Sequence, residues 1–235
     1  MRLPLFPLHT VLFPHLPLPL RIFEARYRAM VGDLVVDGSP YAGRFVVSLI
    51  TEGSEVGDAP EVQPHPQAVG TVAEIRQAEQ MTDGRWVLLA VAGARVAIGA
   101  VDRRGPYPIA EVTELPEVVG EAPPEGLGGL MASVQEALDG YLDSVKRFAV
   151  AASSTRQQMD DVLTPLRLPE DPLAASYAVA GVIQIELVRK QRLLELPDAV
   201  SRLAVVRGLL LREARLLGDS ALPPIVAGTL HYNPN

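Results

Sequence analysis

The sequence lacks cysteine altogether in its 235 residues. This absence excludes disulfides, thiol nucleophiles and cysteine-ligated zinc or iron–sulfur sites, and it favours a cytoplasmic protein. Long apolar runs are missing as well, since Arg95 divides the run 87–101 and Gln184 and Glu186 end the run 173–183. Neither run reaches the roughly 18 residues that suggest a membrane helix. We therefore expect no membrane insertion.

Basic residues are outnumbered by acidic ones, with 21 lysines and arginines against 28 aspartates and glutamates and a formal net charge of −7. An acidic chain repels nucleic acid at long range, and no strongly basic tract offsets this repulsion. Nucleic acid is therefore an unexpected partner.

Motifs for common enzyme chemistry are also missing. There is no Gly-Lys dipeptide, which excludes a Walker phosphate-binding loop, and no Gly-x-Ser-x-Gly nucleophile elbow. Ser153 or Ser154 with Lys190 is the conceivable Ser–Lys dyad, but serines before a helix normally cap it. We predict no catalytic residues, and thus a protein that is not an enzyme.

The histidines show no spacing typical of metal ligands, such as His-x-x-x-His. They are His9, His15, His65 and His231. The carboxylate pairs Asp160-Asp161 and Glu170-Asp171 precede expected helices, where negative charge is favourable for the helix dipole. Neither a metal nor a cofactor is predicted.

Proline is abundant at the start, where the stretch "LPLFPLHTVLFPHLPLPLRIFEARYRAM" holds five prolines. A secretory signal is not expected, because Arg21 and Glu24 end the apolar run and no small-residue cleavage site follows. Apolar residues recur at every second position, namely Leu16, Leu18, Leu20 and Ile22. Pro17 and Pro19 fall between them and remove N–H donors on one edge only, which predicts an edge strand. A solvated polyproline II segment is the alternative.

The rest of the first half predicts short strands and one helix. Phe23, Tyr27, Met30, Val31 and Leu34 share one helix face, with Glu24 in the first turn. Strands are expected at 44–50, 69–80, 85–93, 94–101 and 107–117, with a hairpin turn at 83–84. Residues 51–67 have the composition of a mobile loop. This pattern is typical of a small barrel or sandwich.

The second half predicts helices. A three- and four-residue apolar period indicates an amphipathic helix over 127–148, and 155–163 is a candidate short helix. Asp171-Pro172 opens a buried helix that is expected to run to about Val188, and Pro197-Asp198 opens another that ends at Gly218. We predict a β-rich domain (1–118), a linker (119–129), a helical domain (130–218) and a proline-rich tail (219–235).

Two turns group aromatic and arginine side chains in the manner of an interaction surface. The candidate binding residues are Tyr41, Arg44, Arg103, Arg104 and Tyr107, with His15 at a neighbouring turn. The alternative interpretation is that both tyrosines are half-buried parts of the β domain with solvated arginine neighbours.

The chain resembles the N-terminal domain of Lon protease. The successive blocks are "LPLFPLHTVLFPHLPLPLRIFEARYRAMV", "VGTVAEIRQAEQMTDGRWVLLAVAGARVAI", "YPIAEVTELPE", "KQRLLEL" and "SRLAVVRGLLLREARLL". The resemblance implies an α+β fold, with an N-terminal PUA-like, β-barrel-like domain followed by a C-terminal α-helical bundle. Departures from the family pattern are His15 for glycine, Ala25 for proline and Val96 for an aromatic. Histidine tolerates positive φ better than most residues, so the turn at His15 is compatible with the fold.

The resemblance also implies a function. In Lon this region recruits protein substrates, whereas ATP hydrolysis and proteolysis belong to later domains, which these 235 residues do not contain. We therefore expect a stand-alone, non-enzymatic module that binds unfolded or exposed polypeptide segments, as an adaptor in protein quality control. An RNA-binding protein is the alternative, because PUA-like folds also bind RNA.

Overall fold

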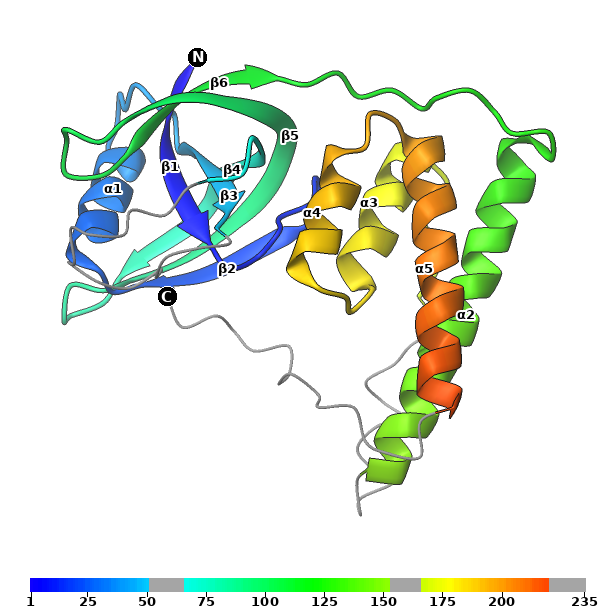
Figure 1. Cartoon of the computed structure of the whole chain (residues 1–235). Coiled ribbons are helices and arrows are strands. Elements are labelled where there is room, and N and C mark those ends of the chain that lie inside the picture. Colours follow the sequence, from blue (N-terminus) through cyan, green and yellow to red (C-terminus); the bar gives the residue numbers. More distant parts are fainter. Residues whose placement is uncertain (51–65, 153–165, 220–235) are drawn as a thin grey trace. The chain divides into compact units, whose positions relative to one another are not determined.

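The computed structural model describes residues 1–50, 66–152 and 166–219 (Figure 1). These residues form two compact units, one made of Met1–Pro116 with Gln184–Glu195 and the other beginning with Glu117–Ile183 and continuing from Leu196. The expected short helix at 155–163 and almost all of the expected mobile loop and tail lie outside the described residues.

The first unit is built on a mixed six-stranded sheet with the order β2-β5-β4-β3-β1-β6. Its strands are β1 (Arg2–Leu8), β2 (Pro17–Ile22), β3 (Arg44–Leu49), β4 (Val69–Gln80), β5 (Trp86–Asp102) and β6 (Ile109–Glu114). Among these strands, as far as the structure describes them, the β1–β3 pair is parallel and the other pairs are antiparallel. Because β5 also pairs with β6, the strands β5, β4, β3, β1 and β6 close into a ring, and β2 is attached outside it.

Strand β5 is one continuous strand of 17 residues, so the prediction of two strands about Gly93 is wrong. Its first part pairs with β2 and its second part with β6, while β4 follows it along most of its length. Gly93 does not mark a turn, and the strand instead changes course at three register shifts in its ladders. The local sequence of β5 shows apolar residues and a glycine. It does not show that the strand paired with β5 changes from β2 to β6 along its length.

Both faces of this sheet are buried over much of their area. In β1, Leu3 and Leu5 belong to one apolar cluster, while Phe6 and Leu8 belong to the other. Helix α1 (Ala25–Val35) packs its buried residues into the second cluster. They are Tyr27, Met30, Val31 and Leu34, as the helical spacing predicts.

Glu24 precedes α1 as its N-cap residue instead of lying in the first turn. Its side chain makes no capping bond, and its carboxylate accepts a hydrogen bond from Arg26 Nε at 2.9 Å. Its carboxylate also forms an ion pair with Arg26.

Strand β2 confirms the prediction of a proline-bearing edge strand. Leu18, Leu20 and Ile22 are buried, whereas Pro17 and Pro19 are exposed. Among the residues that the structure describes, β2 pairs with β5 alone. Since proline has no N–H, the donors on the outer edge are removed at both proline positions, and the inner edge keeps its ladder.

We expect that the double substitution Pro17→Ala and Pro19→Ala increases self-association, because it restores two N–H donors on an exposed sheet edge. Light scattering during size-exclusion chromatography over a range of protein concentrations measures the effect. Pro106→Ala, at an exposed turn position, is the matched control. A double variant with the same mass distribution as the wild type would contradict this role of the prolines.

Helix α4 (Leu187–Glu195) belongs to the first unit although it lies far along the chain. Arg95, only 2 % exposed, donates from one guanidinium nitrogen to the carbonyl of Leu194 at 2.8 Å and from the other to the carbonyl of Pro116 at 3.1 Å. Gln191 Nε2 donates to the carbonyl of Val69 at 3.0 Å. The expected division at 119–129 therefore needs correction, because one helix of the predicted helical domain packs with the strands.

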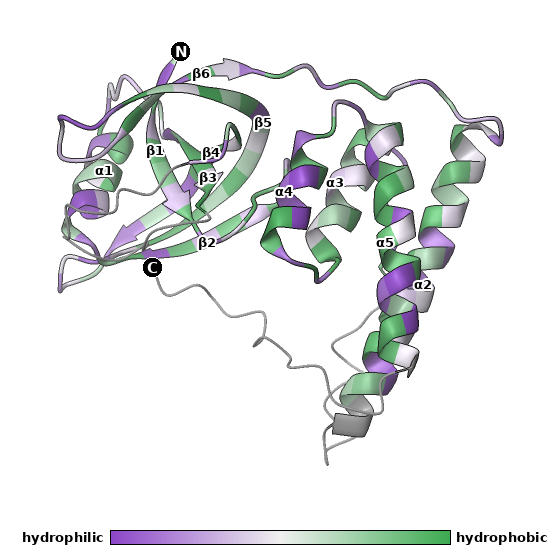
Figure 2. Cartoon of the chain, in the orientation of Figure 1, coloured by the Kyte–Doolittle hydropathy of each residue, from purple (hydrophilic) through white to green (hydrophobic). Residues whose placement is uncertain are grey.

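The second unit contains α2 (Gly126–Ala152), α3 (Pro172–Val182) and α5 (Ala199–Asp219). Helix α5 packs against α2 and α3, and hydrophobic and hydrophilic stretches alternate along α2 and α5 (Figure 2). Helix α2 begins inside the predicted linker. Asp171 caps α3 by accepting a hydrogen bond from the Ala174 N–H at 2.8 Å, as predicted.

The helix expected from Asp171-Pro172 to about Val188 is in fact two helices. Helix α3 ends at Val182, since its C-cap residue Ile183 has a non-helical ψ of 131°. Helix α4 starts after Glu186, whose carbonyl accepts bonds from Arg189 and Lys190. β-Branched residues such as Ile183 and Ile185 have lower helix propensity, which favours a break at this point.

Arg202 is the buried cation of the second unit. It donates to Ser176 Oγ and to the carbonyl of Leu196, both at 2.8 Å, and its guanidinium lies 4.2 Å from the centre of the Tyr177 ring. The Tyr177 hydroxyl in turn donates to Glu117. These bonds connect α5, α3 and the segment before α2 within the unit.

We expect Arg95→Met to lower the free energy of unfolding by roughly 2–4 kcal/mol, because it leaves two carbonyls without their donor. Urea unfolding followed by circular dichroism measures the change. Arg85→Met is the matched control, since Arg85 is exposed and its ion pair among the described residues is with the neighbouring Asp83. Equal effects of the two substitutions would contradict the role assigned to Arg95.

Candidate functional site

The predicted site residues lie mainly in two turns of the first unit. Tyr41 and Arg44 lie in and after the turn before β3, where Ala42 and Gly43 have positive φ. Tyr41 is half-buried and packs against both apolar clusters. Arg44 is half-buried at the first position of β3. These two residues therefore keep part of their side chains accessible to a partner.

Tyr107 is buried, with 5 % exposure, and its ring belongs to an apolar cluster. Its hydroxyl donates to Asp33 Oδ2 of α1 at 2.7 Å. Burial, followed by the interactions with Asp33 and Tyr41, raises the pKa of Tyr107 far above its ordinary value. This placement fits the interpretation of Tyr107 as part of the β domain and leaves little of its ring for a partner.

We expect Tyr107→Phe to lower the free energy of unfolding at neutral pH by about 1 kcal/mol, through the lost bond to Asp33. Because the folded pKa is raised, the neutral hydroxyl is favoured in the folded state, and its stabilisation declines once the pH rises above the unfolded value near 10. The gap between wild type and variant should therefore narrow as the pH rises through that range. Urea unfolding at neutral and alkaline pH measures it, and a constant gap would contradict this role.

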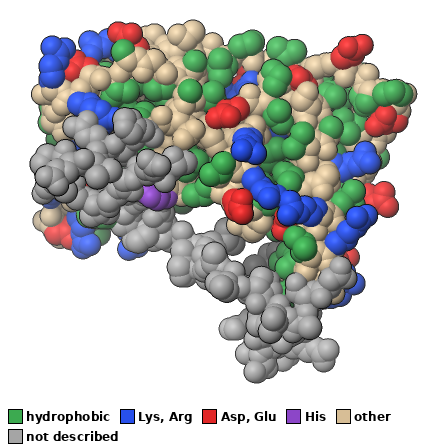
Figure 3. All heavy atoms as spheres, in the orientation of Figure 1, with side chains coloured by type: hydrophobic (Ala, Val, Ile, Leu, Met, Phe, Trp, Pro, Cys, Tyr) green, Lys and Arg blue, Asp and Glu red, His purple; other side chains and the backbone are tan. Residues whose placement is uncertain are grey.

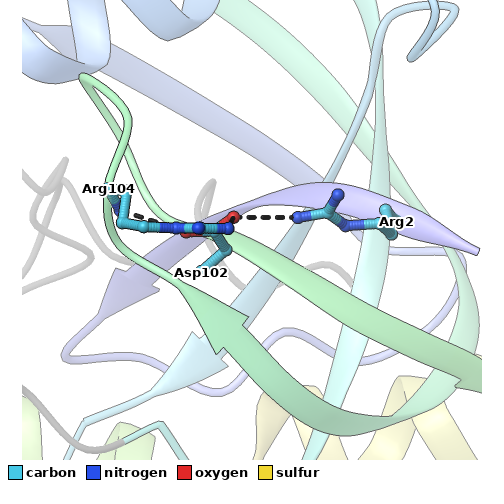
Figure 4. A network of polar contacts seen from close by, with 3 residues as sticks. All are labelled: Arg2, Asp102 and Arg104. Atoms are coloured by element: carbon cyan, nitrogen blue, oxygen red, sulfur yellow. Dashed lines mark hydrogen bonds and ion pairs between the residues drawn. The ribbon is translucent and has the colours of Figure 1, made fainter.

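Arg104 of the second turn and Arg2 of β1 bond the same carboxylate, that of Asp102 (Figure 4). Arg104, with a side chain that is 90 % exposed, bonds Asp102 at 2.8 Å, and Arg2 of β1 reaches the same carboxylate at 3.2 Å. The bond with Arg104 is the main cause that holds the pKa of Asp102 well below its usual range. Arg103 is half-buried beside this network. The shared carboxylate offsets part of the positive charge, and exposed pairs of this kind contribute little stability.

Arg2 and Asp102 were not among the predicted site residues. Asp102 is visible in the sequence beside its two arginines. Arg2 comes from β1, which joins the network because β1 pairs with β6 through Arg2↔Glu111 and its neighbours. That register depends on the fold and has no local sequence signal.

His15 has a φ of 68°, a left-handed conformation that histidine tolerates better than most residues. It is exposed, and its N–H donates to the carbonyl of Ala92 in β5 at 2.9 Å. It therefore lies at the start of β2, whereas the other five predicted residues lie at the turns that flank β3 and β6. Peptide binding by the set of six residues stays a prediction.

A different surface emerges from the strand register. In the ladder of β2 and β5, Pro17 lies opposite Val91 and Pro19 opposite Leu89, and Val87 follows on the same side of β5. The intervening residues of both strands, from Leu18 and Leu20 to Leu88 and Ala90, are buried in the core. These five side chains therefore point to the opposite face of the sheet, and we name them the proline–valine face: Pro17, Pro19, Val87, Leu89 and Val91.

The proline–valine face is partly open to solvent. Val87 is 38 % exposed, both prolines are exposed, and Leu89 and Val91 are half-buried. Polar residues border it on both sides, with Arg21 opposite Val87 on β2 and Glu79 opposite Val87 on β4. Hydrophobic side chains also reach the surface between charged ones on the side of the molecule drawn in Figure 3.

This face was missed because "WVLLAVAG" reads as a run buried on both sides. Strand alternation distinguishes Val87, Leu89 and Val91 from their neighbours only when the partner strands are known. The one local signal is the alternation of prolines in β2, which predicted their exposure but not what lies beside them.

Other kinds of site find no support in the described residues. Within them, no three histidine, aspartate or glutamate side chains gather as a metal site would require. A groove of about 420 Å³ in the second unit is lined mainly by apolar residues, among them Leu127, Met131 and Leu168, and its one carboxylate is Glu170. No helix in the described ranges is both long and apolar enough to cross a membrane.

The fold and these surfaces define an α+β protein with a mixed sheet that keeps one apolar face partly open. The chain belongs to the family described as the ATP-dependent protease La (LON) substrate-binding domain, whose model matches residues 2–212. The resemblance seen in the sequence is thereby confirmed.

Relatives and solved structures agree with this assignment. Lon protease 1 of Thermus thermophilus is 29% identical over 220 residues, and Lon protease 2 of Syntrophobacter fumaroxidans is 26% identical over 218 residues. The matches cover 91% and 92% of this chain, which spans about a quarter of the length of these relatives (25% of each).

The chain is also similar to the crystal structure of a Lon N-terminal domain protein from Xanthomonas campestris, with a TM-score of 0.57 and 25% identity over 88% of this chain and 98% of that one. The N-terminal domain of a Mycobacterium avium complex Lon protease shares the fold, with a TM-score of 0.58 and 21% identity over 89% and 98% of the two chains.

Proposed function

We propose that this protein is a non-enzymatic module that binds unfolded or exposed polypeptide segments through the proline–valine face. The observation that carries the proposal is a partly open apolar sheet face on a chain that belongs to a substrate-binding family. Apolar surface that remains exposed in a protein with a well-buried core is a common mark of an interaction site. A role as a cytoplasmic adaptor in protein quality control, on a PUA-like barrel, is part of the same proposal.

The chemistry of the face suits unfolded chains better than folded ones. Five apolar side chains on three strand rungs form a small surface, which favours weak, transient binding in roughly the micromolar range. Pro17 and Pro19 are rigid and lose little conformational entropy when a partner covers them. Unfolded segments expose the apolar side chains that such a surface can cover.

RNA binding is the second candidate, and the charge distribution disfavours it. Arg2 and Arg104 share the carboxylate of Asp102, so the most arginine-rich turn is partly neutralised. The chain as a whole carries a net charge of −7. Binding through phosphates would weaken steeply with added salt, whereas binding through an apolar face would not.

We expect Leu89→Ser and Val87→Ser each to weaken peptide binding by about 1 kcal/mol, roughly fivefold, through lost apolar burial. Fluorescence anisotropy with a labelled extended peptide of alternating valine and polar residues, at low and high salt, measures the affinity. Val36→Ser is the matched control, because Val36 is 58 % exposed at the end of α1 and lies outside the face.

Circular dichroism and thermal unfolding establish that each variant is folded. Folded variants that bind like the wild type would overturn the assignment of the face. A steep loss of affinity with salt, accompanied by binding of single-stranded RNA, would favour the second candidate.

A further inference from the structure

Strand β4 is longer than the partner on its outer side. Its ladder with β3 ends at Glu74, and the Ile75 N–H makes the last bond on that side, to the carbonyl of Gly43 at 3.0 Å. From Gln77 to Gln80, β4 pairs with β5 and with no other strand in the described part of the chain. The end of β4 is therefore a second sheet edge, on the side of β5 opposite to β2.

The direction of the backbone groups in β5 follows from one bond. The Ala92 N–H donates to the carbonyl of Leu16 at 2.9 Å and so faces β2. Backbone groups alternate between the two sides of a strand, so those of Leu89 and Val87 face β4. In an antiparallel ladder, the residues opposite them must then face β5 in return.

Gln77 and Glu79 are the β4 residues opposite Leu89 and Val87. Their N–H and C=O groups are consequently used in the ladder with β5. The groups of the next residues, Ala78 and Gln80, point away from β5 toward the open edge. Both residues are exposed.

The two edges of this part of the sheet differ in the backbone N–H donors that point outward. On the β2 edge, prolines at 17 and 19 remove the outward N–H donors. On the β4 edge, the outward positions are Ala78 and Gln80, which keep both donor and acceptor. Only the β4 edge can therefore form a complete ladder with another strand.

We propose that the β4 edge binds an extended segment of a client polypeptide as an added strand, paired with Ala78 and Gln80. This inference rests on the proposed function and specifies how the client is held. Two outward donors and two outward acceptors at strand spacing match an extended backbone, and backbone pairing of this kind does not depend on the client's sequence. That property suits a module that binds unfolded chains of many sequences.

Charge indicates which client residues are preferred. Glu79 is exposed, lies beside the open edge and takes part in no ion pair among the described residues. An added strand places one side chain next to Glu79 on the same face, so a lysine or arginine there is favoured. A second copy of this chain is a poorer occupant, because each copy carries a net charge of −7.

Ala78→Pro tests the edge directly, because it removes one outward N–H and leaves the ladder with β5 in place, as the prolines of β2 do. Ala78→Ser, which keeps the N–H, is the matched control. We expect Ala78→Pro to weaken binding of the extended valine peptide about tenfold and Ala78→Ser to leave it unchanged. Hydrogen exchange of the Leu89 and Val87 amides, which face β4, establishes whether the ladder of the variant is intact.

Peptides with single backbone N-methyl groups provide a second test on the wild-type protein, whatever the folding of the variant. Methylation at alternate positions should abolish binding and methylation at the positions between should not, because only every second N–H faces the edge. A version of the valine peptide with lysine at its polar positions should also bind more tightly than a version with glutamate there, because of Glu79.

The outcomes separate the two proposals. If Leu89→Ser weakens peptide binding but Ala78→Pro and N-methylation do not, the proline–valine face is kept as the binding surface. The proposal that the client adds a strand to the β4 edge is then wrong. If neither the face nor the edge matters, both are wrong. A wild-type dimer that Ala78→Pro dissociates would show that the edge pairs with a second copy, and would overturn the client proposal.

Discussion

The fold of the first unit depends on the pairing of β5 with three other strands. Over its 17 residues β5 joins β2, β4 and β6, so removing it would leave β2 without a partner and open the ring of strands. The register of β5 also decides which residues are core and which are surface. A shift of one residue would turn Val87, Leu89 and Val91 inward and expose Leu88 and Ala90. The identity of the open face is thus a consequence of the same ladders that close the ring.

The sequence predicted those elements whose signals are local. Two predictions agree with the structure: the strand at 69–80 and the start of the helix at Asp171-Pro172. Both signals, the alternation of apolar residues and the helix cap, depend on residues that are close in the sequence. The continuity of β5 and the place of α4 were not predictable in this way. Arg95 bonds the carbonyl of Leu194, which is 99 positions away. A contact over such a distance in sequence leaves no pattern in the spacing of apolar residues. The surroundings of the predicted site residues were not predictable for the same reason, since the Tyr107 hydroxyl bonds Asp33 of α1, 74 positions away.

Two buried arginines hold distant segments together through bonds to main-chain carbonyls. Arg95 and Arg202 donate to main-chain carbonyls at 2.8–3.1 Å, and Arg202 also bonds a serine hydroxyl. Carbonyls near helix ends carry partial negative charge and accept such donors well. One arginine side chain thus supplies hydrogen bonds to more than one acceptor. Arg95 thereby connects β5 with the end of α4, and Arg202 connects α5 with α3.

The course of the chain explains why the family model spans both units. The backbone passes between the units near residues 116, 183 and 195, so neither unit is one continuous segment. Residues 187–195 belong to the first unit, although the helices before and after them in the sequence, α3 and α5, belong to the second. A family defined on the strands alone would leave Arg95 without the carbonyl of Leu194. The match over residues 2–212 covers the strands together with the helix that supplies this carbonyl, and the open sheet face and open sheet edge of those strands both depend on β5.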